Sequence, residues 1–353
     1  MPSAAAALSN VASSVYRVPI QERLVFFMND TIDNSEGTRT GTGFGKLLLF
    51  GEHSAVYGYP ALGVALPFAT TVRLTFGRSP AGRRPTIDDP DRDAIMPIFD
   101  SLGTGVSIDH VEIASDVPRG VGFGSSASLT AAVARALLRE ADDTSVWDMA
   151  NTLERSFHGT PSGIDTGLAV HGGACSFTFG LAAQLPRIEK LPIPPVTLVA
   201  AAVPRTGTTG ELVGRIRKAV KNRDSETLES LAKLGEHATR GTQSFSRLAA
   251  GERAALTDLG AAADAAHVVL RKLGLSTDRL ERCLDAGRAR GALGGKLSGA
   301  GGGGAFFLIA PDAETGKSIA AAVSEAIDDS TETGARMARP YVFVFDESGI
   351  RLR

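Results

Sequence analysis

The distribution of apolar and polar positions along the chain predicts a series of strands. Short apolar runs bounded by glycine, proline or charged residues are typical of buried strands. Such runs occur at residues 23–30, 46–50, 70–76, 196–203, 305–310 and 341–346. Between them, the polar segment 35–43 is predicted to be a linker, and the charged, proline-bearing segment 78–92 a mobile surface loop.

Other segments have the periodicity of amphipathic helices. Leu129, Val133 and Leu137 fall on one face of a helix that is predicted to begin at Ser126. Further helical patterns cover residues 145–157, 210–290 and 312–327. Strands and helices alternate in both halves, which favours an α+β architecture with a domain boundary near residue 190, at the proline-rich segment LPIPPV.

Composition narrows the class of protein. The 353 residues are 43% hydrophobic and 22% charged, which is typical of a globular protein with one large or two moderate domains. The formal charge of −2 gives no field that would attract nucleic acid or an anionic membrane. No apolar run is long enough to span a bilayer, and Cys175 and Cys283 form neither a disulfide framework nor a metal motif. We therefore expect a cytoplasmic protein without nucleic-acid or membrane partners.

The first residues form an alanine- and serine-rich tail. It lacks acidic residues and carries a single basic residue, Arg17, within residues 1–21. An organelle transit peptide would hold more arginine, and a secretory signal would begin with basic residues. The hypothesis is that residues 1–40 are an extension that is poorly ordered in part.

A glycine- and serine-rich stretch, GFGSSASL at residues 122–129, directly precedes the first predicted helix. The amino end of a helix has unpaired amides and a partial positive charge, and glycines allow a large anion to approach the backbone. Phosphate would fit these features. The alternative is a tight turn with a serine N-cap. The stretch is not a Walker loop, and GAGGGG at 299–304 precedes a predicted strand instead of a helix, so a dinucleotide fingerprint is excluded.

Four segments in order resemble the GHMP kinase family. They are GKLLLFGEHSAVYGYPAL, PRGVGFGSSAS, ERSFHGTPSGIDTGLAVHGG and KLSGAGGGGAFFL. The third segment and GEHSAVYG are similar to the mevalonate kinase branch in particular. The resemblance implies a two-domain fold, with a ribosomal S5 domain 2-like ATP-binding domain at 41–190 and a ferredoxin-like, helix-rich domain at 191–353.

The resemblance also implies the roles of individual residues. ATP phosphates would lie against Gly122, Gly124, Ser125, Ser126, Ala127 and Ser128. Mg²⁺ would be held by Ser126 and Glu154, since hydroxyl and carboxylate oxygens suit this hard ion. Asp165 would accept the proton of the acceptor hydroxyl, with Lys46 beside it. His158 and His171 are interpreted as structural.

The implied acceptor is mevalonate, phosphorylated on its 5-hydroxyl to give 5-phosphomevalonate in isoprenoid synthesis. Its expected contacts are His53, Glu52, Thr206, Thr208, Gly299 and Ala300. The chain departs from the family after VPR at 203–205, where TGTTG inserts residues and makes Thr206, Thr208 and Thr209 competing candidates. The resemblance leaves a homodimer open.

Two alternatives remain open. One is another GHMP kinase that acts on phosphomevalonate or a sugar. Phosphomevalonate would require additional cations near the acceptor, and Arg205, Arg215 or Arg217 could supply them. The other is a catalytically silent nucleotide-binding regulator. Lys46, Glu154 and Asp165 argue against the regulator, because a protein that only binds nucleotide needs no base.

Overall fold

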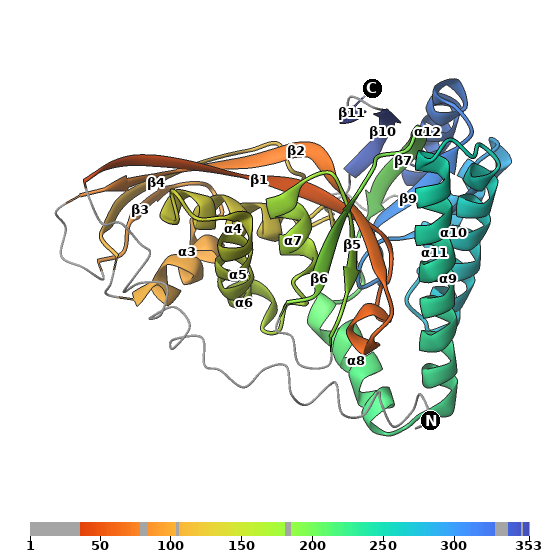
Figure 1. Ribbon diagram of the computed structural model, residues 1–353, viewed down its shortest axis with the longest axis horizontal. Coiled ribbons are helices and arrows are strands. Elements are labelled where there is room, and N and C mark those ends of the chain that lie inside the picture. The colour runs from red at the N-terminus through yellow and green to blue at the C-terminus, as the bar shows by residue number, and fades with distance from the viewer. Residues whose placement is uncertain are drawn as a thin grey trace.

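The protein consists of two β-sheets with helices packed against them. A computed structural model describes residues 36–77, 83–103, 106–180, 185–328, 338–346 and 349–352. The two sheets and their helices confirm the α+β class (Figure 1). The strand that is predicted at residues 23–30 lies outside the described residues. No helix in the described ranges is long and apolar enough to cross a membrane.

The first sheet has six strands, in the order β3-β4-β2-β5-β6, with β1 paired to β2. The strands are β1 (Gly37–Phe50), β2 (Ala61–Phe76), β3 (Thr86–Asp88), β4 (Ile108–Ser115), β5 (Ala174–Thr178) and β6 (Arg187–Leu191). The associated helices are η1 (Ala55–Tyr57), α3 (Arg92–Ser101), α4 (Ser125–Leu137), α5 (Asp143–Leu153), α6 (Arg155–His158) and α7 (Ile164–His171). Helices α4 and α7 pack against β1 and β2.

The apolar run at the end of β1 is buried on both faces of the sheet. Leu48 belongs to the core formed with α4, α5 and α7, whereas Leu47 and Leu49 belong to a second core on the opposite face. Successive side chains of a strand point to opposite faces. A continuous apolar run is therefore what a strand between two cores requires, and the strand predicted at residues 46–50 is confirmed as the end of β1.

The prediction of a linker at residues 35–43 was wrong, because β1 begins at Gly37 and pairs with β2 from Phe76 onward. A Cβ on Gly41 would lie 2.1 Å from the carbonyl oxygen of Ala132, and one on Gly43 would lie 2.2 Å from that of Ser128. Glycine in a strand allows close approach of another backbone. The glycines that suggested a linker are present because α4 lies directly on the strand.

The segment 78–92 also holds regular structure. Strand β3 pairs in parallel with β4, and α3 begins at Arg92. Arg84 donates two hydrogen bonds of 2.8 Å to Asp100. Of the loop predicted at 78–92, residues 78–82 lie outside the described ranges.

The second sheet has five antiparallel strands in the order β11-β10-β7-β9-β8. They are β7 (Val196–Val203), β8 (Gly294–Leu297), β9 (Gly304–Ala310), β10 (Ala338–Asp346) and β11 (Gly349–Leu352). The helices are α8 (Thr209–Lys221), α9 (Ser225–Ala249), α10 (Ala255–Lys272), α11 (Asp278–Ala289) and α12 (Ala313–Asp328). The predicted strands at 196–203, 305–310 and 341–346 and the helical regions at 210–290 and 312–327 are confirmed.

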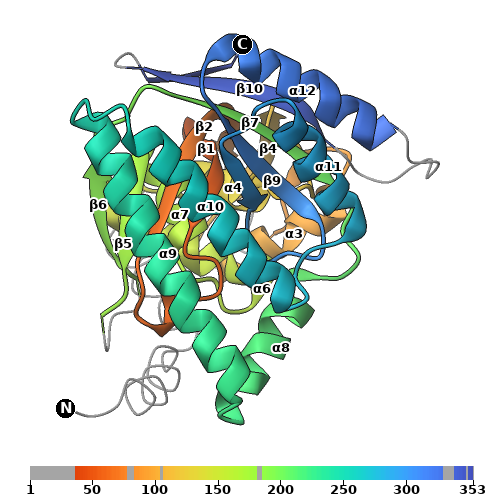
Figure 2. The same cartoon turned by 90° about the vertical axis from the view of Figure 1, so that its right-hand side faces the viewer.

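A shared core joins the two halves. Leu47 and Phe50 of β1 pack in one cluster with Leu198 of β7, Phe245 of α9 and Phe307 of β9. Figure 2 shows α9 and α10 crossing this side of the molecule. The first sheet ends at Leu191 and the second begins at Val196. Because apolar side chains from both halves form one cluster, the division into separate domains at residue 190 stays a prediction.

Candidate active site

The loop before α4 leaves the amino end of this helix open. Gly124 is the N-cap of α4 with a φ of 82°, and no side chain caps the helix. Gly122 also has a positive φ, 105°, which is unfavourable for residues that carry a Cβ. The first amides of a helix lack acceptors within the helix and carry the positive end of its dipole. The expected phosphate contacts at residues 122–127 therefore lie at an uncapped helix terminus.

Ser128 is an exception among the expected phosphate contacts. Its side chain is fully buried, and its hydroxyl lies 2.8 Å from Thr70 Oγ1 and donates to the carbonyl oxygen of Ser125 at 3.0 Å. Its amide donates to the carbonyl oxygen of Gly124 at 2.8 Å. Both donors of Ser128 are thus engaged inside the protein, so this residue fastens α4 to the sheet and is not placed to contact a phosphate.

The two glycines of the loop are packed against catalytic candidates. A Cβ on Gly124 would lie 2.6 Å from Cγ of Lys46, and one on Gly122 would lie 3.0 Å from both Cβ of Ala305 and Nη2 of Arg205. The amide of Lys46 donates to the carbonyl oxygen of Phe123 at 2.8 Å. The loop is therefore held directly over the Lys46 side chain.

Replacing Gly124 by alanine is expected to weaken nucleotide binding, because the new methyl group would displace Lys46 and the loop. The positive φ alone should cost about 1 kcal/mol of stability. Gly251→Ala is the matched control, since Gly251 has a φ of 94° and no atom lies within 4 Å of the position that a methyl group would take there. Thermal melting should show a similar strain in both variants, whereas titration with a fluorescent ATP analogue should show a loss of affinity in Gly124→Ala alone.

Lys46 and Asp165 form an ion pair at the bottom of the candidate site. The distance from Lys46 Nζ to Asp165 Oδ2 is 2.9 Å, and the side chains are 5% and 47% exposed. Lys46 extends from β1, and Asp165 lies in the first turn of α7. A buried ammonium thus holds a carboxylate whose other side is open to solvent. Such a carboxylate can accept a proton from a hydroxyl group that approaches from outside.

Glu154 lies beside this pair, at the junction of α5 and α6. It accepts hydrogen bonds from Ser126 Oγ at 2.6 Å and from Thr130 Oγ1 at 2.9 Å. Burial raises its pKa to about 8, although the two hydroxyl groups oppose the shift. The charges of Asp165 and Lys46 also act on the Glu154 pKa, so the three groups that were expected to share a pocket do lie together.

The residues at this point fit a magnesium ion. Mg²⁺ prefers oxygen ligands and is commonly bound by one or two protein groups together with substrate phosphates. The Ser126 hydroxyl and the Glu154 carboxylate lie next to each other, beside the helix terminus where the phosphates are expected. Glu154 has hydroxyl partners and no direct ion pair with Lys46 among the described residues. A cation bound here would favour the ionised form of this carboxyl group, whose pKa burial raises.

Two further residues that face the same pocket were not assigned catalytic roles from the sequence. His158 Nε2 lies 3.3 Å from Ser126 Oγ and 3.4 Å from Glu154 Oε1. Arg205 donates to Thr209 Oγ1 at 2.9 Å, and its Nε is buried without a partner in the described part of the chain. The charge of Asp165 acts on the pKa values of both His158 and Arg205.

His53 and Glu52, in the segment after β1, have different surroundings. His53 has a φ of 59°, and its Nε2 donates to the carbonyl oxygen of Ala300 at 3.0 Å. The Glu52 carboxylate is buried and paired with Lys296, whose ammonium also donates to the carbonyl oxygen of Leu297 at 2.7 Å. The expected acceptor contact by Glu52 is therefore not supported, because its charge is neutralised inside the core.

Acidification should destabilise the protein through His53. Burial lowers the pKa of His53 to about 4 from an ordinary value of 6.5, so the folded protein holds this side chain neutral. The unfolded chain binds more protons between these two values, and stability is lost as the pH falls from about 6.5 to 4. The loss should reach about 3 kcal/mol. Urea titrations at several pH values should show a shallower pH dependence for His53→Asn, because asparagine tolerates positive φ and does not titrate.

The threonines after β7 have different roles. Thr208 is the N-cap of α8 in a reciprocal capping box with Glu211. Its hydroxyl accepts a hydrogen bond from the Glu211 amide. Its role is therefore structural, and the expected contact of Thr208 with an acceptor is not supported. Thr209 is bound by Arg205. Thr206 contacts the carbonyl oxygen of Gly302 through its amide at 2.7 Å and its hydroxyl at 3.3 Å. Thr206 is thus the threonine that adjoins the glycine-rich loop.

The glycine-rich loop between β8 and β9 faces the segment that carries His53. Gly299 has a φ of 93°, and no atom lies within 4 Å of the position that a Cβ would take there. The carbonyl oxygen of Ala300 accepts the hydrogen bond from His53. Ser298 bonds both the amide of Leu48 at 3.1 Å and its carbonyl oxygen at 2.9 Å. This hydroxyl fastens the loop to β1 and keeps Ala300 against His53. The contact of Gly299 and Ala300 with an acceptor stays a prediction.

Comparison with known proteins identifies the family. Residues 93–173 match the GHMP kinases N terminal domain, and residues 252–329 match the GHMP kinases C terminal domain. A mevalonate kinase of Pyrococcus horikoshii is 32% identical over 301 residues, which cover 75% of this chain and 87% of the relative. The chain belongs to the GHMP kinase family. The resemblance seen in its four sequence segments is confirmed.

Solved structures of GHMP kinases share this fold. The L. major mevalonate kinase in complex with R-mevalonate superimposes with a TM-score of 0.70 at 23% identity, covering 88% of this chain and 98% of the other. The galactokinase of Lactococcus lactis in complex with galactose gives a TM-score of 0.66 at 18% identity, covering 94% and 98% of the two chains. Two kinases with different acceptors thus fit almost equally well, so the fold by itself does not select the acceptor.

In a GHMP kinase the described arrangement has the parts that phosphoryl transfer requires. The open amino end of α4 can hold phosphates, and Lys46 and Asp165 can act on an acceptor hydroxyl. His171 does not join them: its Nδ1 lies 3.7 Å from Asp143, and its ring packs edge-on against Trp147. The interpretation of His171 as structural agrees with this position, while His158 lies within the site.

Proposed function

We propose that this GHMP kinase transfers the γ-phosphoryl group of ATP to the 5-hydroxyl of mevalonate, giving 5-phosphomevalonate and ADP. The observation that carries the proposal is the ion pair of Lys46 with a half-exposed Asp165, next to an uncapped helix terminus. The named relatives support mevalonate as the acceptor, because the relative from Pyrococcus horikoshii is 32% identical and is a mevalonate kinase.

We infer the following reaction from the positions of these groups. The acceptor hydroxyl gives its proton to Asp165, and its oxygen forms a bond to the γ-phosphorus as the bond to the bridging oxygen of ADP breaks. Lys46 keeps Asp165 in place and stabilises the developing negative charge on the acceptor oxygen. The amides at residues 124–127 hold the phosphates, and Arg205 faces the same pocket with a guanidinium that can offset their charge.

Magnesium is part of the proposal. Ser126 and Glu154 would hold the ion, which would neutralise charge on the ATP phosphates. His158 lies within hydrogen-bonding distance of both groups. Thr130 holds the second oxygen of Glu154.

The proposal is tested by following phosphate from γ-labelled ATP into product. Purified protein with Mg²⁺ should label mevalonate, whereas galactose and phosphomevalonate should remain unlabelled. Labelling of phosphomevalonate or a sugar instead would assign a different acceptor to the same site. If ATP binds but none of the three acceptors is labelled, the hypothesis of a silent nucleotide-binding regulator is supported instead.

A further inference from the structure

Three arginines lie on the segment that leads from β7 into α8, and the structure separates their roles. Arg205 is directed toward the phosphate loop, as described above. Arg215 donates through Nη2 to the carbonyl oxygens of Leu273 at 2.8 Å and Gly274 at 3.0 Å. These carbonyl groups follow the last turn of α10, where a cation is favourable. Arg215 therefore anchors α8 to α10.

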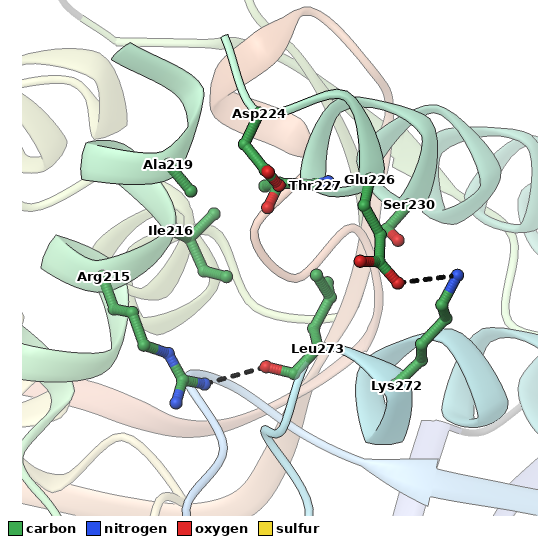
Figure 3. A pocket seen from close by; sticks show the side chains of 9 residues that line it. All are labelled: Arg215, Ile216, Ala219, Asp224, Glu226, Thr227, Ser230, Lys272 and Leu273. Atoms are coloured by element: carbon green, nitrogen blue, oxygen red, sulfur yellow. Dashed lines mark hydrogen bonds and ion pairs between the residues drawn. The ribbon is translucent and has the colours of Figure 1, made fainter. Parts of the chain in front are cut away.

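The hollow beside Arg215 does not look like a ligand site. It measures about 220 Å³ and lies between α8, α9 and α10 (Figure 3). Its charged groups are already engaged, since Lys272 is 3.0 Å from Glu226 and Asp224 accepts from the amide of Thr227 at 2.8 Å. Among these described groups, the hollow therefore presents no unpaired charge that could bind a ligand. Of the two arginines of α8, Arg215 has a structural role, and the role of Arg217 remains to be considered.

Arg217 reaches across from α8 to the half of the molecule that carries the catalytic residues. Its Nη2 donates to Thr160 Oγ1 at 3.3 Å. Thr160 lies in the loop between α6 and α7, five residues before Asp165. Burial raises the pKa of Tyr57, in the segment that carries His53, and the charge of Arg217 opposes this shift. The Arg217 guanidinium thus contacts the loop that leads to Asp165, and its charge acts on the Tyr57 side chain.

The guanidinium of Arg217 has no anionic partner in the parts of the chain that the structure describes. Its hydrogen-bond partner is a neutral hydroxyl, and the side chain is exposed. By contrast, Arg288 of α11 is paired with Asp264 at 2.8 Å, and Arg271 of α10 is paired with a carboxylate of α11. An arginine presents a planar fork of donors that matches a carboxylate with two parallel hydrogen bonds.

We propose that Arg217 binds the carboxylate of the acceptor and selects hydroxy acids over sugars. The inference rests on the proposed function and extends it to specificity. An acceptor whose hydroxyl is at Asp165 would place its carboxylate near Thr160, five residues earlier in the same loop, where Arg217 makes its contact. A neutral sugar would leave this guanidinium without a partner, and a site built for an ionic hydrogen bond discriminates strongly against ligands that lack the anion.

The test compares Arg217→Gln with wild-type protein on mevalonate and on its uncharged amide. For mevalonate, kcat/KM should fall by about 10- to 100-fold, mainly through KM, while KM for ATP changes by less than about twofold. The ratio of kcat/KM for the acid to that for the amide should fall toward 1 by a similar factor. Arg217→Lys should recover part of the loss, because it keeps the charge without the fork.

Lys218→Gln is the matched control, since Lys218 is the neighbouring exposed cation on the same helix and is expected to behave as wild type. Melting temperatures of all variants should agree with wild type. A wild-type ratio of acid to amide in a folded Arg217→Gln protein would overturn this inference while leaving the proposed function intact. Absence of mevalonate turnover in wild-type protein would instead overturn the proposed function, and this inference with it.

Discussion

Replacing Asp165 by asparagine is expected to lower kcat for mevalonate by about 10²- to 10⁴-fold. Asparagine has nearly the same shape but cannot accept a proton from the acceptor hydroxyl. The change also leaves Lys46, which is 5% exposed, without the carboxylate that lies 2.9 Å from its ammonium. Steady-state measurement of ADP release gives kcat, and calorimetry with a non-hydrolysable ATP analogue should show nearly unchanged nucleotide affinity.

Asp278→Asn is the control for this variant, because Asp278 is an exposed residue in the first turn of α11. It removes the same charge away from the site and should leave kcat unchanged. If Asp165→Asn retained more than about a tenth of the wild-type kcat, Asp165 would only orient the hydroxyl and would not act as the base.

Replacing Glu154 by glutamine is expected to weaken binding of Mg²⁺ by at least about 10-fold and to lower turnover at limiting Mg²⁺. Glutamine can still meet the hydroxyls of Ser126 and Thr130, but it lacks the negative charge that the ion requires. Burial raises the pKa of Glu154 to about 8. Metal binding should therefore release a proton at neutral pH, and affinity should rise up to about tenfold per pH unit as the pH increases toward 8.

Calorimetry in two buffers with different ionisation enthalpies measures this proton release, with Mn²⁺ binding followed by electron paramagnetic resonance as a second readout. In Glu154→Gln the pH dependence of metal affinity should disappear. Glu140→Gln is the control, because Glu140 is exposed just after the end of α4 and should retain the wild-type dependence. Unchanged metal affinity in Glu154→Gln would place the ion elsewhere.

Much of the fold could be predicted because its elements follow local patterns. Val196–Val203 is a strand with every residue buried, which an uninterrupted apolar run indicates. The helix predicted from Ser126 begins at Ser125. The strand at 37–43 was missed because its glycines, which indicate a linker in isolation, make room for α4. That reason is a contact with a helix about 90 positions away, and no local pattern contains it.

The candidate site divides in the same way. The glycine-serine loop and the positions of Lys46, Glu154 and Asp165 were evident as motifs, and the structure brings these side chains together. The motifs could not indicate that Glu52 is buried against Lys296, because the pair joins positions 244 residues apart. The sequence offered Arg205, Arg215 and Arg217 together as cations near the acceptor. It could not separate them, because the contact of Arg217 with Thr160 joins the two halves.

By itself, the sequence determined the α+β class, the order of most strands and helices, the membership of the GHMP kinase family and the residue types that phosphoryl transfer needs. These depend on periodic burial, helix termini and short motifs, in which the interacting groups lie within a few positions of each other. Only the tertiary structure decided which side chains face the pocket and which are neutralised in the core. Such pairings depend on how two sheets and their helices pack, and packing joins residues whose separation along the chain carries no information about their distance in space.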